Sequence, residues 1–172
     1  MRALFLIAVL TLPAAPALAA TQTACTAAEY RQFDFWVGNW TVTARNGGKL
    51  VGTNDVTKPY GNCVVMEHWA GVRGSHGSSF NTYDSGRHVW HQTWVDDSGT
   101  LLLLDGGMQS GSMVLSGASV GTDGKTTLNR IAWTPLPNGT VRQHWTISTD
   151  GGRTWTDAFD GIYSRAGSPA SQ

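Results

Sequence analysis

Polar side chains alternate with tryptophans along several segments of this chain, and this pattern suits the binding of a small molecule. Glu67 and Trp69 stand two residues apart, and Gln92 has a tryptophan two residues away on either side. Two-residue spacing places side chains on one face of a β-strand. A face that mixes indoles with a few hydrogen-bonding groups suits a small ligand with an aromatic or glycosidic face and one polar handle. The residues expected to contact such a ligand are Glu67, Trp69, Asn81, Trp90, Gln92, Arg130, Gln143 and Trp145.

Glu67 is the candidate for acid–base catalysis at such a site. A lone carboxyl group in an apolar interior has a raised pKa and can act as a general acid or base. Arg130 offers a cation that pairs with Glu67 or with a ligand anion. The same residues also fit a filled core in which Glu67 and Arg130 form an internal ion pair. The binding and filled-core interpretations therefore both stay open.

Other catalytic and metal motifs are weak in this sequence. No nucleophile elbow with a serine beside a base is predicted, and the five histidines form neither H-x-H nor H-E-x-x-H. His68 and His144 are the candidates for metal ligands from separate strands, or for the single axial ligand of a haem. A surface position is the simpler interpretation for both histidines, and no cofactor is predicted.

The chain that must position these residues has the pattern of an antiparallel all-β domain. From Trp36 onward apolar residues recur with period two, and Asn-Gly, Asp-Gly and similar turns separate the runs. Strands are expected at residues 36–43, 49–57, 63–69, 75–83, 89–95, 100–105, 112–116, 126–133, 140–148 and 154–165. A meander of this length has two exposed edges unless it closes. We therefore expect an up-and-down barrel of about eight to ten strands, with a two-sheet sandwich as the alternative. A short helix is expected at residues 26–35, with Thr26 and Glu29 forming a capping box.

The start of the chain has the layout of a cleavable secretory signal. One positive charge precedes an apolar run over residues 3–12, and the small residues Ala17–Ala20 follow. The expected organisation is a signal peptide at residues 1–19, one barrel domain at 20–165 and a flexible tail at 166–172. No later segment is apolar enough to cross a membrane.

Composition and cysteine content agree with export. Twelve basic residues balance twelve acidic ones, without the basic stripe that nucleic-acid binding requires. Cys25 and Cys63 would meet an oxidising compartment after export, which favours a disulfide between them. A metal or redox role is less favoured, because the sequence has no C-x-x-C motif. We therefore expect a periplasmic or secreted location.

Residues 148–155 fit the pattern S-x-D-x-G-x-T-W, which resembles the Asp-box of sialidase-type propellers. In those proteins the box braces a hairpin: the aspartate caps turn amides and the tryptophan packs beneath. Propellers carry several boxes and this chain has one. Its residues Ser148, Asp150, Gly152 and Trp155 are therefore expected to be structural.

The segment Gly38-Asn39-Trp40 resembles the G-x-W motif of lipocalin-like (calycin) barrels. In those barrels the tryptophan closes one end and an arginine from the last strand lies across it, a place that Arg165 fits. A wider resemblance to the exported bacterial DUF1579-type family covers residues 33–40, 67–69, 81–84 and 90–94 and the Asp-box hairpin. That resemblance implies a fold and brings no assigned activity.

The leading hypothesis is an exported, lipocalin-like barrel that binds a small, partly apolar or aromatic molecule in its interior. One alternative is an enzyme that uses the same cavity, with Glu67 as general acid or base. The other is a structural or interaction module with a filled core.

Overall fold

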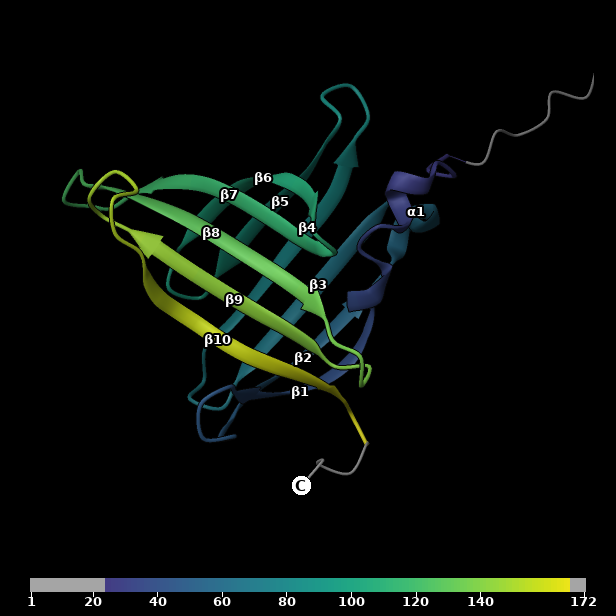
Figure 1. The fold of residues 1–172 in the computed structure, drawn as a ribbon, viewed down its shortest axis with the longest axis horizontal. Helices are drawn as coiled ribbons and strands as arrows, with labels where there is room; N and C mark the ends of the chain where they lie inside the picture. The colour runs from purple at the N-terminus through teal and green to yellow at the C-terminus, as the bar shows by residue number, and fades with distance from the viewer. Residues whose placement is uncertain (1–23, 168–172) are drawn as a thin grey trace, which may run out of the picture.

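Short turns bring each strand back beside the one before it, and the last strand returns to the first (Figure 1). The computed structural model describes residues 24–167, whose ten antiparallel strands close into a barrel. The strands are β1 (Gly38–Ala44), β2 (Leu50–Thr57), β3 (Val64–Gly71), β4 (His76–Asp84), β5 (Val89–Asp96), β6 (Leu101–Gln109), β7 (Ser112–Val120), β8 (Thr126–Pro135), β9 (Val141–Ser148) and β10 (Thr156–Arg165). The predicted barrel is confirmed. The predicted signal peptide at residues 1–19 lies outside the described residues, as does most of the predicted tail.

Strands β6 and β7 run further than the sequence pattern predicts, because glycines interrupt the alternation. Glycine is a poor strand former in isolation, yet here it is required. A Cβ on Gly106 would overlap the carbonyl oxygen of Val114, and one on Gly117 would overlap that of Leu103. Close backbone packing therefore explains both the glycines and the longer strands.

Two 3-10 helices replace the expected helix at residues 26–35: η1 (Ala28–Arg31) and η2 (Asp34–Trp36). The predicted capping box is wrong, because no side chain caps the first turn. Tertiary burial decides the local structure instead. Phe33 and Trp36 are fully buried, and their rings stack with centroids 4.9 Å apart. The tight turns bring both rings into one end of the barrel, which we term the capped end.

Gly38, Trp40 and Arg165 meet at the capped end, as the G-x-W resemblance implies. The guanidinium of Arg165 lies over the indole of Trp40, with 3.9 Å between Cζ and the ring centroid. Its Nη1 donates to the carbonyl of Val37 at 2.7 Å. Gly38 has a φ of 144°, and a Cβ there would overlap the guanidinium. This cation–π contact therefore requires glycine at position 38.

The predicted disulfide between Cys25 and Cys63 is present. It ties the N-terminal segment to the end of α1 (Pro59–Asn62), which is a tight turn because three of its residues have positive φ. Arg31 reinforces this link by donating through Nη2 to the carbonyls of Cys25 and Asn62. The N-terminal segment is thus fixed over the capped end. Within residues 24–167, no helix has the length and apolar character needed to span a membrane.

The hairpin between β9 and β10 is braced by its Asp-box, as predicted. Asp150 Oδ1 accepts the backbone N–H groups of two turn residues at 3.0 and 2.9 Å, and Gly152 N donates to Ser148 Oγ at 2.8 Å. Trp155 Nε1 donates to the carbonyl of Gly152 at 3.2 Å, and the residue remains 42% exposed. This hairpin and the turns at residues 45–49, 72–75, 97–100 and 121–125 form the open end, opposite the aromatic cap.

Candidate functional site

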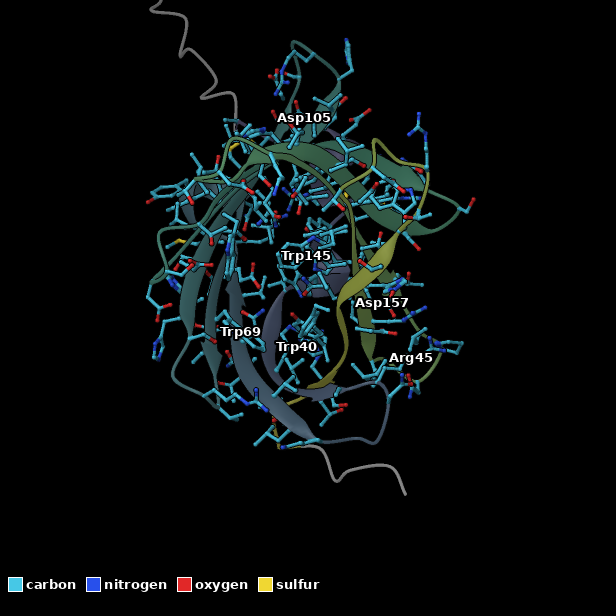
Figure 2. All side chains as sticks on the ribbon, turned by 90° about the vertical axis from the view of Figure 1, so that its left-hand side faces the viewer. Trp40, Arg45, Trp69, Asp105, Trp145 and Asp157 are labelled. Carbon is cyan, nitrogen blue, oxygen red and sulfur yellow. A yellow bond between two sulfur atoms is a disulfide. The ribbon has the colours of Figure 1, made fainter. Side chains whose placement is uncertain are left out.

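A cavity of about 250 Å³ occupies the barrel between the aromatic cap and the open end. It is lined by Glu67, Trp69, Ser75, Gln92, Trp94, Leu102, Ile131, Trp133, Gln143, Trp145, Ala158, Phe159 and Tyr163. Ser75 and Ala158 are exposed at its mouth, whereas Trp133 and Tyr163 are buried at its base. Figure 2 views the barrel from the open end, with Trp69 and Trp145 inside the ring of strands.

Glu67 of β3 places a carboxyl group in the wall of this cavity, with only 4% of the residue exposed. Its Oε1 accepts a hydrogen bond from Asn54 Nδ2 at 2.6 Å, and its Oε2 accepts one from the Ser79 hydroxyl at 2.7 Å. Neither donor carries a charge. Burial raises the pKa of Glu67 to about 7, and the two hydrogen bonds offset only part of that effect. The group therefore titrates near neutral pH.

One backbone carbonyl sets the direction of the hydrogen bonds around Glu67. Asn81 Nδ2 donates to the carbonyl of Val65 at 2.9 Å, so its Oδ1 accepts from Gln92 Nε2 at 2.8 Å. Asn81 Nδ2 also donates to Ser79 Oγ at 2.9 Å, which turns the hydroxyl hydrogen of Ser79 toward Glu67. The network therefore uses both Glu67 oxygens as acceptors and leaves Oε1 of Gln92 as a further acceptor in the lining.

Three aromatic rings near the mouth lie directly over glycines that face the lumen. A Cβ would overlap the neighbouring ring in each of three pairs: Gly52 with Trp69, Gly77 with Trp94, and Gly161 with Phe159. Because these positions have no side chain, each ring can lie against the barrel wall. The glycines therefore keep large aromatic residues from filling the lumen.

Five of the eight residues predicted to contact a ligand line the cavity: Glu67, Trp69, Gln92, Gln143 and Trp145. Asn81 is buried behind them and orients Ser79 and Gln92 through its amide. Trp90 shares the inner face of β5 with Gln92 but belongs to the capped end. Its ring centroid is 5.7 Å from that of Phe33, and its Nε1 donates to Gln32 at 3.0 Å. Trp90 and Gln92 therefore share one face of β5 but lie at different depths along the barrel axis.

Arg130 lies on the outer face of β8, so its predicted role inside the barrel is wrong. Its neighbours Asn129 and Ile131 are buried whereas Arg130 is exposed, because consecutive residues of a strand face opposite sides. The predicted ion pair with Glu67 is wrong for the same reason. Uncharged donors hold that carboxyl group instead.

His68 and His144 also lie outside the lumen. His68 is exposed, and His144 Nε2 lies 2.7 Å from Asp157 Oδ1. His144, Asp157 and Asp160 have possible metal-ligand atoms within 4.8 Å of one another. However, Arg142 already binds Asp160 through two hydrogen bonds of 2.8 Å. Across the described part of the chain no histidine lines the cavity, so His68 and His144 are not placed to be the axial ligand of an interior haem.

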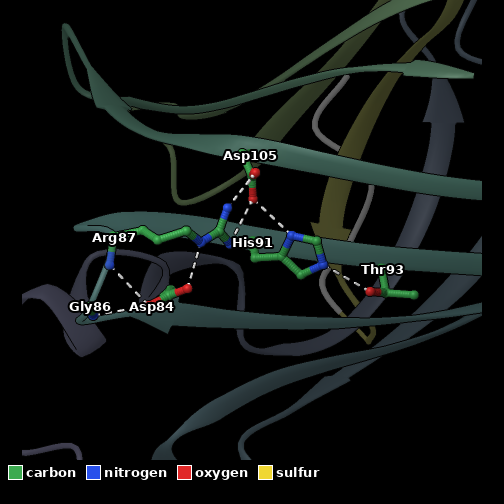
Figure 3. A network of polar contacts seen from close by, with 6 residues as sticks. All are labelled: Asp84, Gly86, Arg87, His91, Thr93 and Asp105. Carbon is green, nitrogen blue, oxygen red and sulfur yellow. Dashed lines mark hydrogen bonds and ion pairs between the residues drawn. The ribbon is translucent and has the colours of Figure 1, made fainter.

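Some carboxylates on the outer face lie beside basic side chains, unlike Glu67. Asp105 accepts from Arg87 Nη1 at 2.7 Å and lies 2.8 Å from His91 Nδ1 (Figure 3). Arg87 also donates through Nε to Asp84 at 2.6 Å. The hydrogen bond from Arg87 is the main cause that lowers the pKa of Asp105. The pKa values of Glu67 and Asp105 are therefore shifted in opposite directions.

Several residues of the site are absent from the sequence-based prediction. The missed lining residues include Trp94, Trp133, Phe159 and Tyr163, and the missed partners of Glu67 are Asn54 and Ser79. Two-residue spacing from Gln92 to Trp94 was a usable signal for the first of these. Asn54 gave no such signal. The buried positions of its strand include Gly52 and Asn54, so the strand lacks the apolar alternation that would identify its inner face.

Comparison with models of protein families and with curated proteins finds no match to this chain. Its relation to the DUF1579-type family therefore stays a prediction, and the argument for function depends on the cavity itself.

Proposed function

We propose that this protein is an exported barrel that binds a small, partly apolar or aromatic molecule in its interior cavity. The observation that carries the proposal is the cavity of about 250 Å³, whose walls are mainly aromatic and whose few polar groups are oriented by a fixed network. A concave, mostly apolar site with a few convergent polar groups is typical of small-molecule binding.

The volume supports a small ligand. Water occupies about 30 Å³ per molecule in the liquid, so 250 Å³ corresponds to roughly eight non-hydrogen atoms. A single aromatic ring with a short substituent fits this space, whereas a haem or a long lipid does not. The DUF1579-type resemblance and the disulfide support the exported, periplasmic or secreted setting that we propose for this binding.

The eight tryptophans provide a direct test, because four line the cavity and four do not. In ¹H–¹⁵N NMR spectra of the full chain, a bound molecule such as benzyl alcohol should shift the indole N–H signals of Trp69, Trp94, Trp133 and Trp145. Those of Trp36, Trp40, Trp90 and Trp155 should remain near their original positions. Uniform small shifts across all eight signals would contradict an interior site.

Two glycine variants give a matched test of the cavity. A side chain in Gly77→Ala would overlap the Trp94 ring, whereas Gly107→Ala has open space around the added methyl. We expect Gly77→Ala to displace the ring into the lumen and to weaken binding about tenfold, in line with the overpacking penalties seen in protein cores. Gly107→Ala should bind as the wild type does, as measured by calorimetric titration with benzyl alcohol. Equal affinities for the two variants would contradict the proposed location.

The pKa of Glu67, raised to about 7, favours a second candidate, an enzyme that uses the same cavity for proton transfer. General acid–base groups work best when their pKa lies near the operating pH. Turnover of a bound compound that Glu67→Gln abolishes without changing its affinity would support catalysis over simple binding.

A further inference from the structure

We infer that the cavity selects a small organic cation, a protonated amine whose ammonium group pairs with Glu67. This inference rests on the proposed interior binding and names the class of ligand. It follows from the charge balance of the lumen, the acceptors that the network presents and the aromatic walls.

Within residues 24–167, the cavity lining has one carboxyl group and no basic side chain. Of the described residues that line the cavity, none is lysine, arginine or histidine. The only other ionisable lining residue is Tyr163, whose hydroxyl donates to Gln143 and whose pKa burial raises well above its usual value. An anionic ligand would add a second negative charge beside Glu67, at a high electrostatic cost in a buried site.

The hydrogen bonds around Glu67 are directed as an ionised carboxylate requires. Asn54 and Ser79 each donate to a different oxygen, and the Ser79 hydrogen is fixed in that direction by Asn81. Each carboxylate oxygen keeps a lone pair for a further donor. Together with Oε1 of Gln92, the site offers several acceptors to a group with several N–H donors, and ammonium is such a group.

The aromatic walls favour the same ligand class. The faces of indole and phenyl rings carry partial negative charge and attract cations within about 6 Å. Trp69, Trp94, Trp145 and Phe159 surround the space above Glu67. The protein already uses this contact elsewhere, since Arg165 lies over Trp40. None of the described lining residues brings a cation to these rings, so we expect the ligand to supply it.

Three matched probes test the inference: benzylamine, benzyl alcohol and benzoate, which share a ring and differ in charge. At pH about 8, where Glu67 is ionised, we expect benzylamine to bind at least about tenfold more tightly than the alcohol, and benzoate to bind most weakly. Lowering the pH to about 5.5 protonates Glu67, so benzylamine affinity should fall about tenfold while the affinity of the alcohol changes little.

Glu67→Gln removes the charge and keeps the shape. Asn54 Oδ1 has no partner in the described structure, so this amide can turn and accept from the new carboxamide. The variant should lose about tenfold in benzylamine affinity, a larger loss than it shows for the alcohol. Asp55→Asn makes the same charge change on the exposed side of β2 and should change neither affinity.

The outcomes separate the two proposals. Equal binding of amine and alcohol, or an amine affinity that is independent of pH, would overturn the cation inference and leave interior binding intact. Failure of all three probes to shift the lining indole signals would contradict the interior site as well. If Glu67→Gln does not fold, the pH series on the wild-type protein decides.

Discussion

At the capped end tryptophan rings fill the barrel, whereas at the open end they line it. Phe33 stacks on Trp36 and makes an edge contact with Trp133, with centroids 4.9 and 5.3 Å apart. At the open end, in contrast, Trp69 and Trp94 lie over glycines of neighbouring strands. Tryptophan therefore closes one end of the barrel and shapes a cavity at the other. Its neighbours determine the difference, because they are aromatic rings at the cap and glycines at the open end.

Trp36→Ala gives the largest expected loss of stability. The ring is fully buried, and truncation of a buried tryptophan typically costs about 3–5 kcal/mol. Trp94→Ala removes a half-buried ring beside existing space and should cost no more than about 2 kcal/mol. Urea denaturation of both variants measures the difference. Equal losses would mean that the open end is as tightly packed as the cap.

Removal of the disulfide tests whether the aromatic packing at the capped end depends on the covalent link between Cys25 and Cys63. Cys25 and Cys63 are 38 residues apart, and the loop-entropy relation predicts a loss of about 3–4 kcal/mol for the double substitution by serine. Denaturation of the double variant, compared with the wild type, measures this loss. We expect the Trp36 and Trp90 indole N–H signals to broaden, and those of Trp69 and Trp94 to stay sharp. Broadening at both ends would show that the two ends unfold as one unit.

Glu67 lies between the two ends, and its titration adds the smallest expected effect. A carboxyl group with a raised pKa binds its proton more tightly when folded, so the contribution of Glu67 to stability is fully present below its unfolded pKa of 4.5 and is lost as the pH rises to about 7. The loss is about 3 kcal/mol at most. Denaturation midpoints across this range should show the decline in the wild type and a flatter profile in Glu67→Gln. A matching decline in both proteins would assign it to other groups.

The sequence allowed the strands to be predicted better than the cavity. Period-two spacing and turn dipeptides identify all ten strands, and they identify the shared face of Gln92 with Trp90 and Trp94. They do not give the depth of each residue along the barrel. Trp90 pairs with Gly106 near the cap, and Trp94 pairs with Leu102 near the mouth. Depth depends on register with neighbouring strands, which spacing within one strand does not contain.

The wrong placement of Arg130 has a related cause. In β8 both faces carry apolar residues, with Leu128 and Ala132 on the side of Arg130 and Ile131 and Trp133 on the other. Alternation then identifies two faces without assigning either to the lumen. Only the closed sheet, with the cap seated against Trp133, makes that assignment.

The carbonyl of Val65 has a consequence for how this barrel can diversify. It orients Asn81, and through it Ser79 and Gln92, although Asn81 itself does not line the cavity. The main chain therefore sets the pattern of hydrogen-bond donors and acceptors that a ligand contacts, and it does so through Asn81, which does not contact the ligand. Substitution of residue 81 during evolution would therefore change the preferred ligand while all residues that line the cavity stayed the same.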